Sequence, residues 1–248
     1  MKILNLRPAR AALLWGLVLL LALAAALPVR TPAARGYAAA LGNVIGSSVS
    51  GNTLTLTIDN GAEPNDDKLI LEVLDDGIVK VSYRTNDISP SPDTPMIDPN
   101  KTWSPPPASI DASGDPITIE TSKLKIEIAR TPARLTLKDA SGNTLLYEPA
   151  SGGVFYDGVR FMRDPNDNIY GIRSYNANEA APDITRNNSS HPAHAGHQGD
   201  SGGPFMWSTA GYGVLVDSDG GYPYTDLTGK LEFYYGGTPD EGRRYVKN

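Results

Sequence analysis

Short runs of alternating apolar and polar residues dominate the chain after position 41. Residues 53–58 read TLTLTI, the period-two pattern of a strand with one buried face. Similar runs occupy residues 69–73, 78–83, 117–120, 124–128, 134–138, 144–148, 211–217 and 231–235. A 3.6-residue stripe typical of an amphipathic helix is not found in this part of the sequence. Many short strands predict an all-β fold, an antiparallel β-sandwich.

Turn-forming residues stand between these runs. Asp75-Asp76-Gly77 and Ser141-Gly142-Asn143 have the composition of hairpin turns. The chain holds 25 glycines and 20 prolines, a share that favours turns over long helices. Residues 89–107 are rich in proline, which is excluded from central strands and helix interiors. We therefore expect an extended surface loop there.

The N-terminus has the pattern of a secretory signal peptide. Three cations, Lys2, Arg7 and Arg10, precede an unbroken apolar run over residues 11–27. Ala38-Ala39-Ala40 offers a small-residue cleavage site, so residues 1–40 are expected to be a signal peptide that directs the protein out of the cell or to its surface. An uncleaved membrane anchor is the alternative, because the run nears the length of a membrane span.

Charge and cysteine content exclude several classes of function. Residues 1–40 carry five cations and no acids, so residues 41–248 hold 17 cations against 28 acids, a net charge of −11. This balance disfavours nucleic acids as partners and leaves neutral ligands such as sugars open. The absence of cysteine excludes disulfides, thiolate metal sites and a cysteine nucleophile.

Residues 199–204 read GDSGGP, the sequence around the nucleophilic serine of trypsin-like proteases. A serine nucleophile needs a base and an orienting carboxylate, and in those proteases the histidine lies far upstream. Here His191, His194 and His197 all lie within ten residues of Ser201. The motif is therefore interpreted as a glycine-rich loop before a strand, and a serine protease is the weaker alternative.

The three histidines also have the spacing of metal ligands. Pro192 and Gly196 interrupt them, and no glutamate lies among them, so a polar loop is the preferred interpretation. Residues 164–167 resemble the opening of a calcium loop without its glycine and distal glutamate, and we interpret them as a turn. Neither a metal site nor a cofactor is predicted.

Four segments, in order, resemble the N-terminal domain of glycoside hydrolase family 31. The best of them is residues 204–217, PFMWSTAGYGVLVD, which resembles the family's "PF…S..GYGV..D" segment. IYGI at 169–172 resembles the family's "FYGLGE" strand, although Arg173 and Ser174 replace its Gly-Glu. Residues 117–146 resemble a strand and hairpin of that domain, and residues 231–239, LEFYYGGTP, resemble its last strand. The resemblance covers about residues 43–248.

The resemblance implies a galactose-mutarotase-like β-sandwich over residues 41–248, the fold class that the alternation predicts independently. It also implies that catalysis needs two aspartates in a (β/α)8 barrel that follows this domain. Residues 241–248 stand where the first barrel strand should soon begin. We therefore expect no catalytic residue in this chain and interpret it as a fragment or truncated product.

The family's domain carries a loop before the "PF" strand that shapes the substrate pocket, and residues 184–200 match it. Relatives often carry an aspartate at the position of Asn187, but an amide also binds sugar hydroxyls. Tyrosines after the "PF" hairpin are candidates to stack on a sugar ring, with packing inside the sheet as the alternative. The candidate substrate-binding residues are Asn187, Asn188, His191, Asp200, Tyr222 and Tyr224. Having few apolar side chains and no barrel to contact, residues 185–200 are expected to be mobile in this chain.

The predicted function is that of the N-terminal carbohydrate-associated domain of a secreted family 31 glycoside hydrolase or transglycosylase acting on α-glucosides. Its expected partners are an α-linked oligosaccharide or polysaccharide and the enzyme's own catalytic barrel. The alternative is a stand-alone extracellular sandwich that binds sugars or mediates adhesion.

Overall fold

The structure is a computed structural model. It describes residues 41–61, 67–84, 98, 100–150, 153–155, 158–173, 185–190, 202–217, 222–234 and 246–247. The chain divides into two units, Met1–Gly36 and Tyr37–Asn248, and all described residues belong to the second. The predicted signal peptide, residues 1–40, lies outside the described residues. Within the described ranges, no helix combines the length and apolar character needed to cross a membrane.

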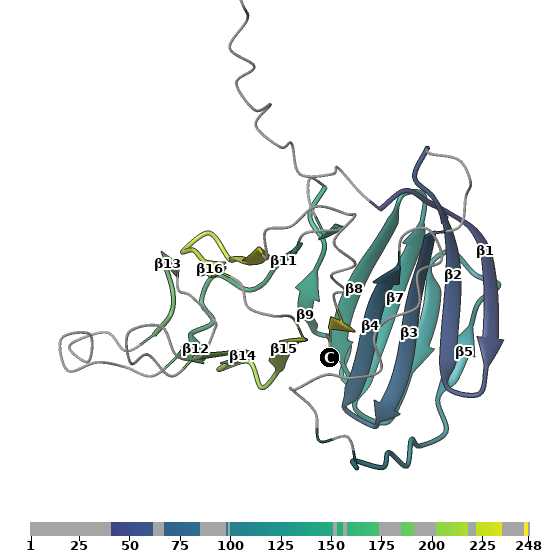
Figure 1. The fold of residues 1–248 in the computed structure, drawn as a ribbon, viewed down its shortest axis with the longest axis horizontal. Helices are drawn as coiled ribbons and strands as arrows, with labels where there is room; N and C mark the ends of the chain where they lie inside the picture. Colours follow the sequence, from purple (N-terminus) through teal and green to yellow (C-terminus); the bar gives the residue numbers. More distant parts are fainter. Residues whose placement is uncertain are drawn as a thin grey trace, which may run out of the picture. The chain divides into compact units, whose positions relative to one another are not determined.

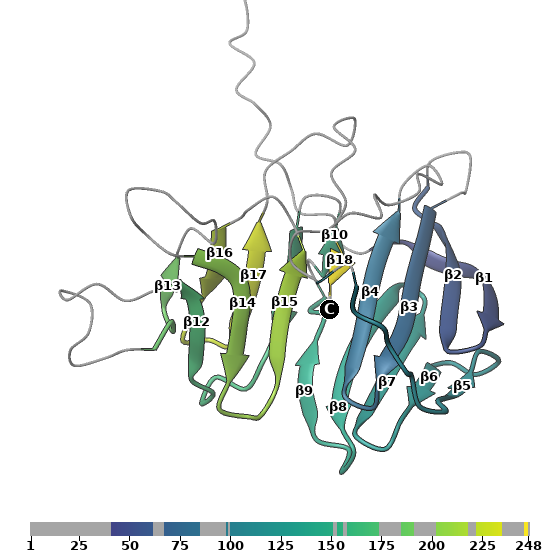
Figure 2. The same cartoon turned by 60° about the horizontal axis from the view of Figure 1, so that its bottom comes forward.

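The described residues form strands and turns (Figures 1 and 2). In chain order the strands are β1 (Asn43–Ser50), β2 (Thr53–Asp59), β3 (Asp67–Asp75), β4 (Ile78–Arg84), β5 (Ser109–Asp111), β6 (Ile117–Glu120), β7 (Leu124–Arg130), β8 (Ala133–Asp139), β9 (Thr144–Tyr147), β10 (Val154–Phe155), β11 (Gly158–Met162), β12 (Ile169–Arg173), β13 (Ser189–Ser190), β14 (Gly202–Ser208), β15 (Gly213–Asp217), β16 (Tyr222–Thr225), β17 (Lys230–Tyr234) and β18 (Val246–Lys247).

These strands make two sheets, and every strand pair described is antiparallel. The eight-stranded sheet has the order β1-β2-β3-β4-β18-β15-β14-β12. The ten-stranded sheet has the order β13-β16-β17-β11-β9-β8-β7-β6-β5, with β10 paired to β11. The all-β prediction with antiparallel sheets is confirmed for the described residues.

The predicted hairpins are present. Asp75 to Gly77 turn the chain between β3 and β4, and Val73 pairs with Val79 across them. In the β8–β9 hairpin the Asp139 carboxylate accepts hydrogen bonds from the backbone N–H groups of Ser141 and Asn143. Each run that was predicted from alternation corresponds to a strand, and the bounds agree to within two residues.

Several strands were not predicted from alternation, and one interpretation needs correction. β1, β11, β14 and β16 carry glycine, proline or runs of polar residues, which hide the period-two pattern. GDSGGP was interpreted as a loop before a strand, but β14 already begins at Gly202 and includes the last three residues of the motif. In the proline-rich stretch, residues 98 and 100–107 have no regular structure, as predicted, while 89–97 and 99 lie outside the described residues.

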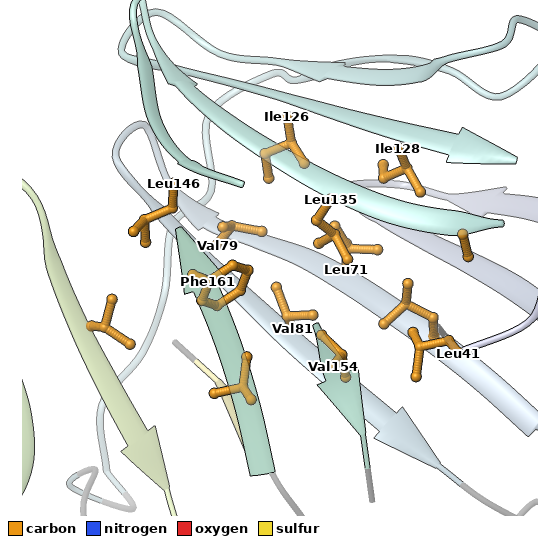
Figure 3. Packing of buried hydrophobic residues seen from close by; sticks show 14 of the residues in the cluster. Leu41, Leu71, Val79, Val81, Ile126, Ile128, Leu135, Leu146, Val154 and Phe161 are labelled. Carbon is orange, nitrogen blue, oxygen red and sulfur yellow. The ribbon is translucent and has the colours of Figure 1, made fainter. Parts of the chain in front are cut away.

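Apolar side chains from both sheets meet in one core (Figure 3). Leu71 of β3 and Val81 of β4 contribute from one sheet, and Ile128 of β7 and Leu135 of β8 from the other. All four are less than a tenth exposed. Each such side chain contributes about 1.5–3 kcal/mol when buried, so this layer is the main force that holds the sheets together. Hydrogen bonds between the sheets add to it, such as the one from Thr121 Oγ1 to the Asp76 carbonyl at 2.5 Å.

We predict that Leu71→Ala lowers the free energy of unfolding by about 2–5 kcal/mol, because it leaves a cavity in this layer. The matched control is Ile45→Ala, whose side chain in β1 is 54% exposed; its effect should stay within about 0.5 kcal/mol. Urea unfolding followed by circular dichroism measures both. Equal losses would show that the two sheets do not depend on this layer.

Candidate functional site

The segment 185–190, the described part of the predicted substrate loop, joins the open edges of the two sheets. The backbone N–H of Arg186 donates to the carbonyl of Ile169 in β12, the edge strand of the eight-stranded sheet, at 2.6 Å. Three residues later, β13 pairs with β16 at the edge of the ten-stranded sheet. The segment therefore fixes the base of the loop to both layers of the sandwich. Figure 1 shows β12 and β13 close together there.

The side-chain amide of Asn187 is fully used in this junction. Its Oδ1 accepts hydrogen bonds from the backbone N–H of Ile169 at 3.1 Å and from Nη2 of Arg163 at 3.4 Å. Its Nδ2 donates to the carbonyl of Asp167 at 3.0 Å and to Oδ1 of Asn168 at 3.2 Å. Both polar ends of the amide are thus satisfied within the chain. The structure gives Asn187 a structural role, and its contact with a sugar stays a prediction.

Arg163 is the buried charge around which this junction is built. Its side chain is 3% exposed, and Nη1 donates to the carbonyls of Asp164 and Asp167, both at 2.8 Å. Nη2 donates to the carbonyl of Asp226 at 2.8 Å, besides its bond to Asn187. A buried guanidinium is tolerated when several acceptors surround it. Arg163 therefore ties the turn after β11 to the turn between β16 and β17 and to the loop base.

A second buried arginine fixes the backbone of the loop base. Arg186 is 2% exposed, and its Nε donates to the carbonyl of Gly171 in β12 at 3.1 Å. Its own carbonyl accepts hydrogen bonds from the hydroxyls of Ser189 and Thr225, both at 2.5 Å. The expectation that residues 185–200 have no partner in this chain is therefore wrong for 185–190. Hydrogen bonds, rather than the apolar contacts on which the prediction was based, hold this part of the loop.

Asn188 has a different position from its neighbour. Its φ is 53°, in the left-handed region where asparagine is one of the few tolerated side chains, and it is exposed. Among the described candidates on the loop, Asn188 is therefore the one that presents its amide to solvent.

The other candidates are only partly described. His191 and Asp200 lie outside the described residues, as do Ser201, His194 and His197, so neither the protease nor the metal interpretation is tested by geometry. Tyr222 and Tyr224 lie in β16, opposite Tyr234 and Glu232 of β17, and their side chains are not described.

Residues 164–167 form the turn that was predicted instead of a calcium loop. The Asp164 carboxylate accepts hydrogen bonds from the backbone and side-chain nitrogens of Asn166, at 2.8 and 3.0 Å. The backbone of Asp167 donates to the Asp164 carbonyl, which closes the turn. The described part of the chain contains no group of three or more metal-ligating side chains.

Two titratable groups near the loop base, Tyr212 and Asp226, have shifted pKa values. Burial raises the pKa of Tyr212 to about 12, so its phenol stays neutral. Burial acts to raise the pKa of Asp226, but hydrogen bonds from Thr228 and Lys230, together with the Lys230 charge, lower it overall. The Asp226 carboxylate therefore stays ionised beside the Lys230 cation.

Comparison with known proteins identifies the domain. Residues 68–173 match the family described as the glycosyl hydrolase 31 N-terminal galactose mutarotase-like domain. Over 217 residues the chain is 63% identical to a 1,6-alpha-glucosyltransferase of Sporosarcina globispora, a match that covers 87% of this chain and 17% of the relative. The chain thus spans about a sixth of the length of that relative.

Solved structures share the fold. A family 31 dextranase of Flavobacterium johnsoniae, solved with isomaltotriose, superposes with a TM-score of 0.66 at 16% identity, over 84% of this chain and 26% of that one. A cycloalternan-forming enzyme of Listeria monocytogenes, solved with a pentasaccharide substrate, gives a TM-score of 0.62 at 17% identity, over 84% and 20%.

The role of Asn187 gives a testable difference between adjacent residues. Asn187→Ala should lower the free energy of unfolding by about 1–3 kcal/mol, because the buried N–H of Ile169 and a donor of Arg163 lose their acceptor. Asn188→Gly should change it by no more than about 0.5 kcal/mol, because glycine adopts the same positive φ without strain. Urea unfolding measures the free energy of unfolding of both variants. Equal values for the two would show that the hydrogen bonds of the Asn187 side chain do not stabilise the junction.

Proposed function

Because this chain carries the N-terminal galactose mutarotase-like domain of the glycosyl hydrolase 31 family, we propose that it is the N-terminal part of a secreted enzyme that acts on α-glucosides. The match of 63% identity over 217 residues to a 1,6-alpha-glucosyltransferase carries this proposal, because identity at that level over a whole domain favours a common activity in the longer proteins. Catalysis would then belong to a barrel that follows the sandwich, and the substrate would be an α-linked glucan.

We propose that the sandwich contributes to substrate binding through the loop that begins at residue 185. Support comes from the way its base is held: Arg163 and Arg186 are both buried and bind backbone carbonyls of β12 and neighbouring turns. A loop that is fixed at its base presents its further residues in a constant direction. Asn188, exposed at the end of this base, would offer an amide to a sugar hydroxyl.

The proposed activity is tested in a chimera. Residues 41–248 of this chain replace the matching segment of the Sporosarcina globispora enzyme, and the formation of α-1,6-glucosyl linkages is compared between the chimera and the unmodified enzyme on the same α-glucan. We expect the chimera to form them, because the domain would complete the substrate pocket. The 248-residue chain alone is the control and should hydrolyse neither maltose nor an aryl α-glucoside, since the proposal assigns both catalytic carboxylates to the barrel. A folded chimera without activity would refute the proposal.

The loop contribution is tested by Asn188→Ala in the same chimera. Loss of one neutral hydrogen bond of about 1 kcal/mol to the sugar should raise KM by roughly fivefold with a smaller change in kcat. The matched control is Ser48→Ala, another exposed polar residue, in β1 and away from the loop base. Unchanged KM in Asn188→Ala would place the loop base outside the substrate pocket.

A further inference from the structure

The outward faces of the two halves of the eight-stranded sheet differ in character. Over β2, β3 and β4 most outward positions are polar or charged, including Thr55, Thr57, Lys68, Glu72 and Lys80, with Ile70 as an apolar exception. Lys80 pairs with Glu72 at 3.7 Å, and Lys68 donates to the Thr57 hydroxyl at 3.1 Å. This is the solvated face that an antiparallel sandwich normally has.

Over β12, β14 and β15 the outward side chains that the structure describes are mainly apolar. We call this surface the aromatic face, formed by Tyr170, Phe205, Trp207 and Leu215. Phe205 is 48% exposed and Trp207 47% exposed, although both belong to the side-chain types that are normally buried. The rings of Tyr170 and Trp207 stack with centroids 4.4 Å apart and an interplanar angle of 21°.

Two glycines shape this face. A Cβ at Gly213 would lie 3.0 Å from Cε2 of Phe205, so the ring of Phe205 lies directly over the backbone of β15. Gly171 has a φ of 91°, and a Cβ there would lie 2.8 Å from the carbonyl oxygen of Phe205, so β12 and β14 approach closely. Because neither glycine has a side chain, the ring of Phe205 can lie over β15 and the backbones of β12 and β14 can approach closely.

A cavity opens beside the aromatic face, where the eight-stranded sheet is incomplete. β18 joins β4 to β15 through two residues only: Val246 pairs with Ser82 and Lys247 with Val81. Beyond that point, the described residues place no strand between β4 and β15 (Figure 2). We call the resulting opening, of about 770 Å³, the seam cavity.

The lining of the seam cavity continues the aromatic face into the core. Phe205 and Leu215, from the aromatic face, and Val79, Leu135 and Phe161, from the core, are among its lining residues. Charged groups stand among its other lining residues, including Lys101, whose Nζ lies 5.0 Å from the ring centroid of Trp103. An apolar floor with such charged neighbours is the usual composition of a protein-binding surface.

We propose that the aromatic face and the seam cavity are the surface on which the remainder of the longer protein packs. This rests on the proposed function, because it takes the chain as the N-terminal part of a longer enzyme. The matched segment makes up 17% of the glucosyltransferase and 26% of the dextranase, so most of each of those proteins lies outside the segment that this chain matches. β18, the last strand described, lies beside β15, so a chain that continues past it begins next to this face.

The chemistry of the surface favours protein over sugar as its occupant. A sugar platform needs a free ring face with hydrogen-bonding groups around it. Here Tyr170 covers one face of Trp207, Phe205 lies against Gly213, and the four side chains of the aromatic face offer only a phenol O–H and an indole N–H. An aliphatic or aromatic side chain of the partner would fill the seam cavity instead.

Hydroxyl-radical footprinting tests the proposal residue by residue. The oxidation rates of Phe205 and Trp207 are compared between the 248-residue chain and the chimera described above. Both should fall several-fold in the chimera, because the packed remainder excludes solvent from their rings. Ile45, 54% exposed, and Leu227, 63% exposed, are internal controls whose rates should stay the same.

Three results would overturn the proposal. If Phe205 and Trp207 were oxidised at the same rate in the chimera as in the isolated chain, the aromatic face would not be covered by the rest of the protein. Protection in the isolated chain that disappears on dilution would assign the face to a second copy. Protection of the isolated chain by isomaltotriose would make it a sugar platform. Because footprinting does not depend on turnover, an inactive chimera with protected rings would refute the proposed function alone.

A second measurement uses the isolated chain only. The unmodified chain should bind the apolar dye ANS, and the double variant Phe205→Ser, Trp207→Ser should bind several-fold less of it with little change in Tm. Leu227→Ser is the matched control and should bind as much dye as the unmodified chain. Equal dye binding by the double variant, or a large loss of its Tm, would show that the rings are not a free surface.

Discussion

The apolar layer between the two sheets is the constraint on which the other features of this molecule depend. Each hairpin sends alternate side chains into it, so that residues as distant in sequence as Leu71 and Ile128 share one core. Because the side-chain period of a strand is two, the same register that fixes this layer also decides what every strand presents to solvent. The polar face over β2 to β4 and the aromatic face over β12 to β15 are both outward halves of strands whose inward halves belong to this core.

The sequence predicts those strands well where alternation and a turn coincide. β2, β3, β4, β6, β7 and β8 were predicted because Leu, Ile and Val alternate with Thr, Lys and Glu in them. β1 lacks this signal, since Val44 alone of its eight residues is buried and part of the core. β14 begins with Gly-Gly-Pro and carries Phe205 and Trp207 outward, so both of its faces are apolar and no period of two is visible. Alternation therefore detects strands that have one face in the core and one polar face in solvent. It misses strands whose two faces are alike in polarity.

The candidate site was less predictable, for a related reason. The segment around Asn187 was identified from the resemblance to family 31, and its polar composition suggested a loop without internal partners. The structure shows that residues 186 and 187 are held by backbone groups of β12, by the carbonyl of Asp167 and by the hydroxyl of Thr225. Hydrogen bonds between segments far apart in sequence leave no local pattern, so a buried arginine such as Arg163 cannot be distinguished from a surface arginine by its neighbours in the chain.

The polar junction and the aromatic face are adjacent, and that adjacency gives the domain a coherent role. The loop base binds one edge of β12 through Ile169, while the next residue along the strand, Tyr170, begins the aromatic face. A body that packed on the rings of Tyr170 and Trp207 would therefore lie next to a loop whose base is fixed by Arg163 and Arg186. The hydrogen bonds at the loop base are directional, so they fix the position at which the loop starts. The rings of the aromatic face instead offer apolar surface, and the attraction between apolar surfaces has no preferred direction. In such an arrangement the sandwich would fix the position of the loop relative to the body that packs on the aromatic face. If that body moved relative to the sandwich, its distance from the loop would change.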